Sequence, residues 1–360
     1  MKEIECDIAI IGAGLTGLTL AYLLKEYNLS IYIIEGRNRL GGRINTVEHE
    51  NLAPQEMGAT WLGKKHTALR KLLKDLSLKT FEQQLGETAV YDPVSTSPAQ
   101  QVKLPPNDNP SYRIQQGSSS LITALAEQIA DTSYIHTQQL VEKIEEQPDG
   151  ILVTTPDHNF LASTAVSTLP PFLLLNSIAV SPNLPAVTRE VMKITHTWMG
   201  NSIKISFSYS NPFWRTNGLS GTIFSNVGPI SEMYDHADVD NQRFALTGFL
   251  NGAYFSLTKE ERQAMALQQL RKYYGNQADE YIAYEEKVWR NDNYTFLPYE
   301  PQVMPHQNNG HLVFRQPYLS GKLFIAGIEI ALQYPGYMEG AVRSAQYVAE
   351  QLEALLTLKE

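Results

Sequence analysis

Cysteine is almost absent from this chain, which has 360 residues and one cysteine, Cys6. One thiol can form neither a disulfide within the chain nor a zinc site built from several cysteines. The eight histidines are scattered, and the closest pair, His306 and His311, lacks the spacing of metal ligands on a helix. We therefore expect no intrachain disulfide and no metal.

Long hydrophobic runs and an excess of positive charge are missing too. No stretch reaches about 18 consecutive apolar residues, which a membrane-spanning helix needs, and the N-terminus lacks the pattern of a signal peptide. Lys and Arg number 29 against 38 Asp and Glu, so the net charge of −9 offers no basic surface for nucleic acid. We expect a cytoplasmic protein with no nucleic-acid partner and no membrane span.

What the chain does contain is a β-α-β pattern in its first 35 residues. The β-branched run Ile4–Ile11 suits a buried parallel strand. Apolar residues at helical spacing then extend from Leu18 to near Asn28, and Ile31–Ile34 forms a second short run that ends at Glu35. The pattern predicts strand, helix and strand.

Three glycines lie in the turn between the first strand and the helix. Gly12 allows a tight turn, Gly14 allows close approach to a pyrophosphate, and Gly17 allows close packing of helix on strand. The helix N-terminus supplies N–H groups for the phosphates. Glu35, 23 residues after Gly12, is placed to accept hydrogen bonds from ribose hydroxyls. The pattern predicts a dinucleotide site.

A second glycine pair follows, in Gly41-Gly42-Arg43, with Arg37 shortly before it. The two arginines are candidates to meet adenosine and pyrophosphate groups. Together with the first turn and Glu35, this segment resembles the extended FAD-binding fingerprint of the flavin-containing amine oxidases, and the chain is identified as similar to that monoamine oxidase-like family.

Further segments of the chain carry the same resemblance. Residues 56–63 (Glu-Met-Gly-Ala-Thr-Trp-Leu-Gly) are similar to the segment that runs beside the flavin, and residues 212–215 and 285–289 are similar to monoamine oxidase motifs. Residues 324–329 and 336–341 are similar to the C-terminal signature of the family. The resemblance implies non-covalent FAD, held by Gly12, Gly14, Gly17, Glu35, Arg37, Gly42, Arg43, Gly58, Ala59, Val141, Trp289, Gly327, Glu329, Tyr337 and Met338.

The resemblance also implies three catalytic residues. Lys204 corresponds to a lysine that holds a water near flavin N5, whereas its strand pattern alone is also typical of a solvated face. Tyr299 and Tyr337 correspond to two aromatic residues that face each other in front of the flavin. The position that carries a flavin-linked cysteine in monoamine oxidases is Pro298 here, so FAD is expected to be non-covalent.

The resemblance implies an α/β fold, with a Rossmann-type FAD-binding domain and an inserted mixed α+β substrate domain. We assign residues 1–66, 111–180 and 300–360 to the FAD domain, and 67–110 and 181–299 to the substrate domain. Several prolines mark 92–110 as a loop, and 66–111 is shorter than in longer family members. Strands are expected at 140–144, 150–155, 164–169, 203–209 and 322–326, and helices at 118–130, 258–275 and 336–356.

The expected activity is oxidation of an amine to an imine, with oxygen as acceptor and hydrogen peroxide as product. A small amine is therefore the expected partner. An L-amino acid oxidase or a porphyrinogen oxidase stays an alternative, although the segment after Gly58 supplies no arginine for a carboxylate. A flavin-binding isomerase or scaffold without oxidase turnover is the alternative from another class.

Overall fold

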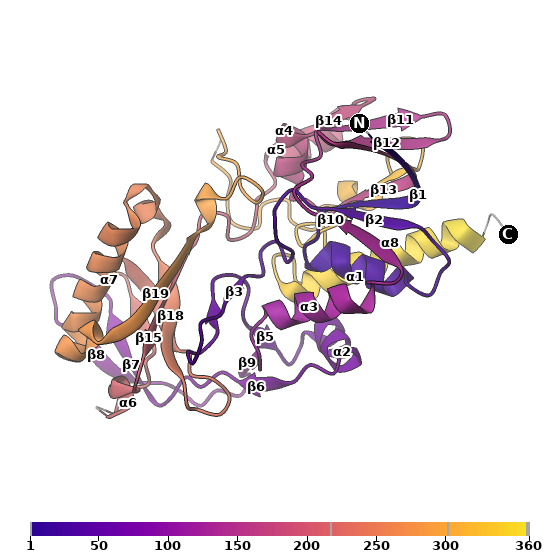
Figure 1. Ribbon diagram of the computed structural model, residues 1–360. Helices are drawn as coiled ribbons and strands as arrows, with labels where there is room; N and C mark the ends of the chain where they lie inside the picture. Colours follow the sequence, from indigo (N-terminus) through magenta and orange to yellow (C-terminus); the bar gives the residue numbers. More distant parts are fainter. Residues whose placement is uncertain (1, 217, 301, 358–360) are drawn as a thin grey trace.

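The N-terminal strand lies inside an eight-stranded sheet that organises one lobe of the molecule (Figure 1). The computed structural model describes residues 2–216, 218–300 and 302–357. β1 (Lys2–Ile11) pairs in parallel with β2 and β13, which places the β-α-β unit at the centre of this sheet. The strand order is β10 (Ser133–His136), β2 (Ile31–Ile34), β1, β13 (His158–Ser167), β12 (Gly150–Thr154), β11 (Lys143–Gln147) and β14 (Ala179–Ser181), with β20 (Leu323–Ile325) also paired to β13.

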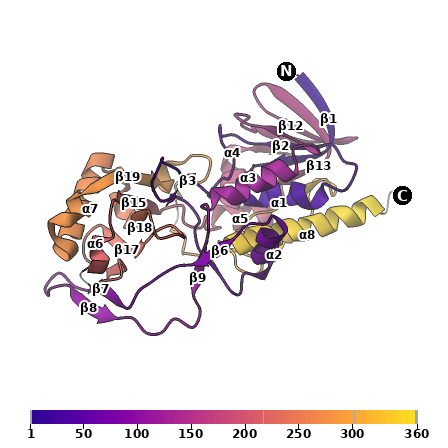
Figure 2. The ribbon, with the colours of Figure 1, turned by 60° about the horizontal axis from the view of Figure 1, so that its bottom comes forward.

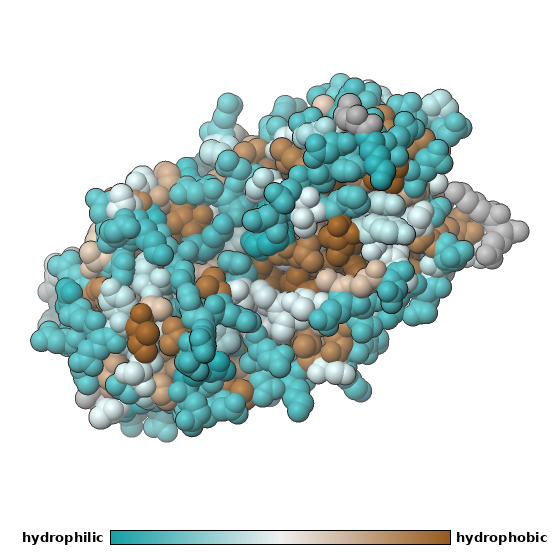
Figure 3. Space-filling view, viewed as in Figure 1, coloured by the Kyte–Doolittle hydropathy of each residue, from teal (hydrophilic) through white to brown (hydrophobic). Residues whose placement is uncertain are grey.

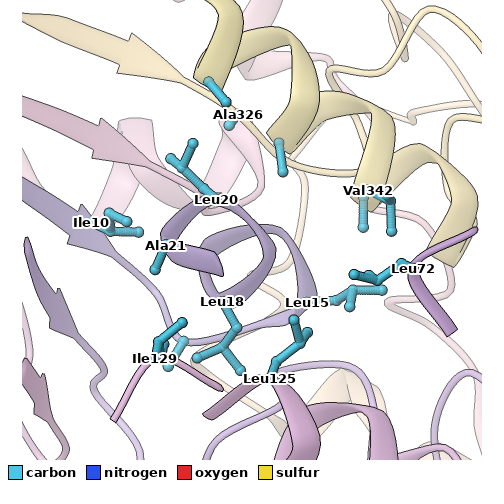
Figure 4. Close-up of a cluster of buried hydrophobic side chains, with 14 of the residues drawn as sticks. Ile10, Leu15, Leu18, Leu20, Ala21, Leu72, Leu125, Ile129, Ala326 and Val342 are labelled. Atoms are coloured by element: carbon cyan, nitrogen blue, oxygen red, sulfur yellow. The ribbon is translucent and has the colours of Figure 1, made fainter. Parts of the chain in front are cut away.

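Helices cover both faces of this sheet because side chains alternate along β1. Ile8 and Ile10 pack under α1 (Leu15–Leu24), α3 (Ser119–Gln128) and α8 (Met338–Thr357), as Figure 4 shows around α1. Ala9 and Ile11 belong to the second hydrophobic cluster, which includes residues of α4 (Pro171–Ser177) and α5 (Ala186–Lys193). The expected Rossmann-type lobe is therefore present.

A second lobe is built on a seven-stranded sheet (Figure 1). Its order is β19 (Tyr281–Val288), β15 (Ile203–Tyr209), β18 (Phe244–Leu250), β17 (Ile230–Asp235), β16 (Ile223–Ser225), β7 (Thr88–Asp92) and β8 (Gln100–Lys103). Ile203, Ile205 and Phe207 pack in one cluster with residues of α7 (Lys259–Tyr274), near the short α6 (Phe213–Thr216). Lys204 and its even-numbered neighbours therefore face away from α7.

Short sheets join the lobes. β3 (Thr46–Val47) pairs with β4 (Gln55–Glu56), and β9 (Ser111–Ile114) pairs with β5 (Leu62–Gly63) and β6 (Thr80–Glu82). Figure 2 shows β6 and β9 between the two lobes. α2 (Thr67–Asp75) packs its leucines into the core of α1 and α8, whereas β7 and β8 join the second sheet, so residues 67–110 contribute to both lobes.

Several boundaries differ from those expected from the sequence. The segment 92–110 is wrong as a loop throughout, because β8 lies inside it and forms a hairpin with β7. The strand expected at 140–144 begins only at Lys143, and the last helix begins at Met338. β15 covers the expected residues, and the helix at 258–275 has the capping box of Thr258 and Glu261. No described helix is long and apolar enough to span a membrane.

Candidate active site

A cavity of about 380 Å³ is lined by both lobes. At one end it is lined by the glycine turns that follow β1 and β2, and at the other by β15, β17 and β18. Figure 3 shows hydrophobic side chains gathered in the middle of one face, between two largely hydrophilic ends. The two ends of the cavity have different chemistry.

The first glycine turn has the shape that a pyrophosphate requires. A Cβ atom on Gly12, whose φ is +104°, would lie 2.6 Å from Thr168 Oγ1, and one on Gly17 would lie 2.1 Å from the Gly12 carbonyl oxygen. Gly14 differs, because a Cβ there would find only Gly42 Cα, at 3.9 Å. Gly12 and Gly17 are needed for packing, while Gly14 leaves open space at the start of α1.

The second glycine pair closes the same space. The Gly41 N–H donates to the Ala13 carbonyl at 2.9 Å, and Gly42 has a φ of +56° beside Gly14. The first N–H groups of α1 have no partner within the helix, and they carry the positive end of its dipole. This cradle of backbone without side chains fits the phosphates of a dinucleotide.

Glu35 lies buried at the end of β2. Its Oε2 accepts the Ala13 N–H at 2.9 Å, and its Oε1 accepts the Arg37 N–H at 2.9 Å. The Arg37 guanidinium donates to Asp292 at 2.7 Å and Thr295 at 2.6 Å, while its buried Nε has no partner among the described residues. Both side chains line the cavity, with Arg37 already paired to a carboxylate.

Arg43 forms a bidentate ion pair with the buried Glu329, with Nη1 to Oε1 at 2.6 Å and Nη2 to Oε2 at 2.9 Å. Glu329 also accepts the Trp198 N–H at 3.1 Å, and Arg43 donates to the Trp198 carbonyl at 3.2 Å. Arg43 and Glu329, each expected separately to hold FAD, therefore meet in space, a contact that the sequence did not predict. It also fixes the loop that carries Trp198 against the first lobe.

The expected cofactor residues divide by position. Those that line the cavity are Gly12, Gly14, Glu35, Arg37, Gly42, Arg43, Gly58, Ala59, Trp289, Tyr337 and Met338. Gly17 and Gly327 do not line the cavity. Gly17 packs against the Gly12 carbonyl beneath the turn, and the Gly327 N–H donates to Ser344 Oγ at 3.0 Å. Val141 lines a separate hollow of about 60 Å³, which Glu35 and Arg37 also line.

Lys204 is a buried side chain of β15, with 1% of its surface exposed. Its ammonium donates to the Gly58 carbonyl at 2.6 Å and to Thr60 Oγ1. The Trp289 indole N–H holds the neighbouring Met57 carbonyl at 2.8 Å. The alternative of a solvated face for Lys204 is therefore wrong, because the even-numbered face of β15 is enclosed by residues 57–61 and the cavity.

Burial controls the charge of Lys204. It lowers the pKa of Lys204 to about 7, although the Glu56 and Glu232 carboxylates favour the ammonium form. Burial also raises the pKa of Glu56, which the Lys204 charge opposes. An exposed lysine stays protonated far above neutral pH. Lys204 differs because its lowered pKa lets it change charge near neutral pH.

Tyr299 and Tyr337, the two tyrosines expected to face each other in front of the flavin, lie in different surroundings. Tyr337 lines the cavity, is 44% exposed and lies 6.0 Å from Trp198 between ring centres. Tyr299 does not line it: its ring packs 4.3 Å from Phe172, and its hydroxyl accepts the Thr197 N–H at 2.6 Å. The structure therefore does not set Tyr299 opposite Tyr337 across the cavity.

Several cavity residues were not singled out from the sequence. Among them are Trp198, Glu232, Phe249 and Tyr294. Glu232 and Phe249 follow from strand pairing, since Lys204 pairs with Phe249, which pairs with Glu232. Their only sequence signal was alternation within two strands, and nothing local indicated that these strands would be neighbours. A flavin-linked cysteine would be expected just before the tyrosine that faces the flavin. The residue before Tyr294 is Asn293, so this position supplies no thiol, as Pro298 supplies none before Tyr299.

Comparison with known proteins identifies relatives along nearly the whole chain. A family model described as flavin-containing amine oxidoreductase matches residues 15–105 and 99–352. Amine oxidase [flavin-containing] B of Canis lupus familiaris is 23% identical over 457 residues, covering 97% of this chain and 86% of that protein. Probable flavin-containing monoamine oxidase A of Dictyostelium discoideum is 23% identical, covering 96% and 97%.

Solved structures share the fold. Wild-type putrescine oxidase bound to putrescine has a TM-score of 0.84 at 24% identity, covering 98% of this chain and all of that one. Cyclohexylamine oxidase from Brevibacterium oxydans has a TM-score of 0.82 at 20% identity, covering 97% and 99%. These matches confirm the expected α/β architecture.

Proposed function

The chain belongs to the flavin-containing amine oxidoreductases, FAD-dependent enzymes that act on CH–NH groups, and we propose that it oxidises a small amine to an imine with oxygen as electron acceptor. Hydrogen peroxide is then the second product, and water hydrolyses the imine. The observation that carries the proposal is Lys204, a buried lysine with a lowered pKa that lines the same cavity as the dinucleotide turn.

The cradle at Gly12, Gly14 and Gly42 would hold the phosphates of FAD, and Glu35 would accept hydrogen bonds from its ribose. When bound, FAD supplies the hydride acceptor and the route of electrons to oxygen. Residues 58–61 line the remaining cavity. The backbone of this segment is fixed by Lys204 at the Gly58 carbonyl and by Trp289 at the Met57 carbonyl. This rigid wall would hold the reacting edge of the cofactor against the substrate space.

Lys204 would hold and move a proton at its Nζ. The ammonium is bound by Gly58 O and Thr60 Oγ1, and Trp61 lies 4.7 Å from it. Because its pKa is about 7, Lys204 can exist in either protonation state at working pH, which is the condition for efficient proton transfer.

Aromatic rings would present the amine in neutral form. Trp61, Trp198, Phe249 and Tyr337 line the cavity. A protonated nitrogen has no lone pair to support loss of hydride from the adjacent carbon, and a poorly hydrated site disfavours the ammonium. Ring faces attract a cation and oppose this effect; desolvation and alignment of the C–H bond are expected to dominate.

The cavity favours an amine over an amino acid. Arg37 and Arg43, the arginines lining its described part, are each paired with a carboxylate, Asp292 and Glu329. Neither is free to bind the carboxylate of an amino acid. This supports amine oxidation over the L-amino acid oxidase alternative.

The test is anaerobic mixing of the yellow, FAD-loaded protein with a panel of primary and secondary amines. We expect bleaching of the flavin absorbance by at least one amine and peroxide formation when oxygen is admitted. Flavin that no amine bleaches would favour the isomerase or scaffold alternative, and bleaching without peroxide would point to another electron acceptor.

Attachment of the cofactor is tested in the same preparation. Because Pro298 and Asn293 supply no thiol and Cys6 is buried in β1, we propose that FAD is non-covalent. Acid or heat should release all of the flavin as intact FAD. Flavin that stays with the denatured polypeptide would contradict this proposal.

A further inference from the structure

One row of side chains crosses three strands of the second sheet on the face that lines the cavity. Lys204 on β15 pairs with Phe249 on β18, and Phe249 pairs with Glu232 on β17. Neighbouring strands lie about 4.8 Å apart, so the backbones of Lys204 and Glu232 are separated by roughly 10 Å. All three side chains line the cavity, which places a carboxylate two strands from the proposed reaction centre.

The Glu232 carboxylate has little to balance its charge. Its one hydrogen bond among the described residues comes from the Tyr234 hydroxyl to Oε2, at 3.1 Å. The Glu232 carboxylate favours the ammonium form of Lys204 but forms no direct ion pair with it within the described residues. Lys204 is committed to Gly58 and Thr60. A half-buried carboxylate whose hydrogen-bond partner is a neutral hydroxyl keeps acceptor positions free for a cationic ligand.

Other acidic groups at the cavity do not share this property. Glu35, the other carboxylate lining its described part, lies at the dinucleotide turn and accepts the Ala13 and Arg37 N–H groups. Between Lys204 and Glu232 the wall consists of the rings of Trp61 and Phe249. The substrate end thus has one negative group at the far side of an apolar, aromatic surface.

From this arrangement we propose that Glu232 binds a second ammonium group of the substrate, so that the enzyme prefers linear diamines over monoamines of equal length. The inference rests on the proposed function and names its substrate class. The reacting amine lies near Lys204, the methylene chain lies along Phe249 and Trp61, and the distal ammonium pairs with Glu232. The same carboxylate repels substrates with a negatively charged end.

The test compares cadaverine with pentylamine, which has the same chain but lacks the second amino group. In the wild-type protein, kcat/KM for cadaverine should exceed that for pentylamine at least tenfold, and added salt should reduce the ratio. In Glu232→Gln the ratio should fall about ten- to hundredfold, as expected for loss of one charge-assisted contact. The loss should lie mainly in KM.

Two further variants control the result. Glu232→Asp keeps the charge and should retain most of the diamine preference, while Glu280→Gln removes an exposed carboxylate and should leave the ratio unchanged. A wild-type ratio near one overturns the proposal without any variant. An equal loss for both amines in Glu232→Gln also overturns it, because that result indicates a structural role.

The outcomes separate the two proposals. If pentylamine bleaches the flavin as well as cadaverine does, amine oxidation stands and the diamine preference fails. If neither amine nor any other in the panel bleaches it, the proposed function fails, and the preference fails with it.

Discussion

The two ends of the cavity differ in how their polar groups are held. At the dinucleotide end, Glu35 and Arg43 are each tied by two or more short contacts to backbone or to an opposite charge. At the substrate end, the pKa of Lys204 is about 7, and Glu232 has a single hydroxyl partner among the described residues. Under the proposed function, the first end would bind FAD through groups that are already fixed, whereas the second would keep charges available for proton transfer and for substrate selection.

The sharpest test of this contrast is Lys204→Met, which removes the charge at the substrate end and keeps an apolar side chain of similar length. We expect flavin reduction or reoxidation to slow by about 10²-fold or more, because a group that organises proton transfer contributes on that scale. FAD should stay bound, since no contact at the dinucleotide end is lost. Stopped-flow measurement of both half-reactions decides which step is affected.

Lys74→Met, on the exposed side of α2, is the matched control and should behave as wild type. If both half-reactions of Lys204→Met run at wild-type rates, Lys204 only anchors residues 57–60 and the proposed proton role is wrong.

Glu35→Ala tests the other end. The FAD dissociation constant should rise about ten- to hundredfold, because a charged acceptor is lost, and turnover at saturating FAD should change little. Glu35→Gln keeps one acceptor for the Ala13 N–H and should give a smaller loss. Titration of the apoprotein with FAD measures both, and an unchanged dissociation constant in Glu35→Ala would remove Glu35 from the site.

The dinucleotide end could be predicted because its residues are contiguous in sequence. Gly12, Gly14 and Gly17 lie in one turn, and Glu35 ends the next strand, so local spacing specifies the geometry. The Arg43–Glu329 pair joins distant segments and was not predicted, because the family resemblance implied only that each residue holds FAD.

The substrate end could be predicted less well because its neighbours come from separate strands. Pairing of β17 with β18 and of β18 with β15 creates the row that contains Glu232, and no local pattern encodes that order. Tyr299 was assigned from its place after Trp289, but the short segment between them instead brings Tyr294 to the cavity. The hairpin of β7 and β8 was hidden by the prolines on both sides of β8.

Substitution of Tyr337 or Tyr299 should have effects of intermediate size, on the rate of flavin reduction for Tyr337 and on stability for Tyr299. Tyr337→Ser should reduce the rate of flavin reduction at low amine concentration about tenfold, through loss of ring contacts, and Tyr337→Phe should be mild. Tyr299→Phe should instead act on stability, because the hydroxyl bonds to Thr195 and Thr197 are lost, at a cost of about 1–3 kcal/mol.

Reduction rates against pH and thermal unfolding of the same variants separate these effects. If Tyr299→Phe slows reduction at unchanged stability while Tyr337→Ser has no effect, the roles of the two tyrosines are reversed.

The smallest expected effect comes from Glu56, a buried residue of β4 that accepts the Ser118 N–H at 2.5 Å and the Thr46 hydroxyl at 3.0 Å. Its carboxylate favours the ammonium form of Lys204. Glu56→Gln keeps an acceptor of the same shape but removes that charge, so the pKa of Lys204 should fall further below about 7. The pH at which the limiting rate changes should therefore move to lower values, by up to about one unit.

The measurement is kcat against pH, at saturating amine, in wild type, Glu56→Gln and the exposed control Glu48→Gln. Lys204→Met should lack the transition near neutral pH altogether, which assigns it to this lysine rather than to the substrate amine. A shift toward higher pH in Glu56→Gln would contradict the electrostatic argument, because removal of a neighbouring negative charge cannot stabilise an ammonium. No shift with full FAD content would mean that Glu56 is already protonated at neutral pH and acts only as a cap for the backbone.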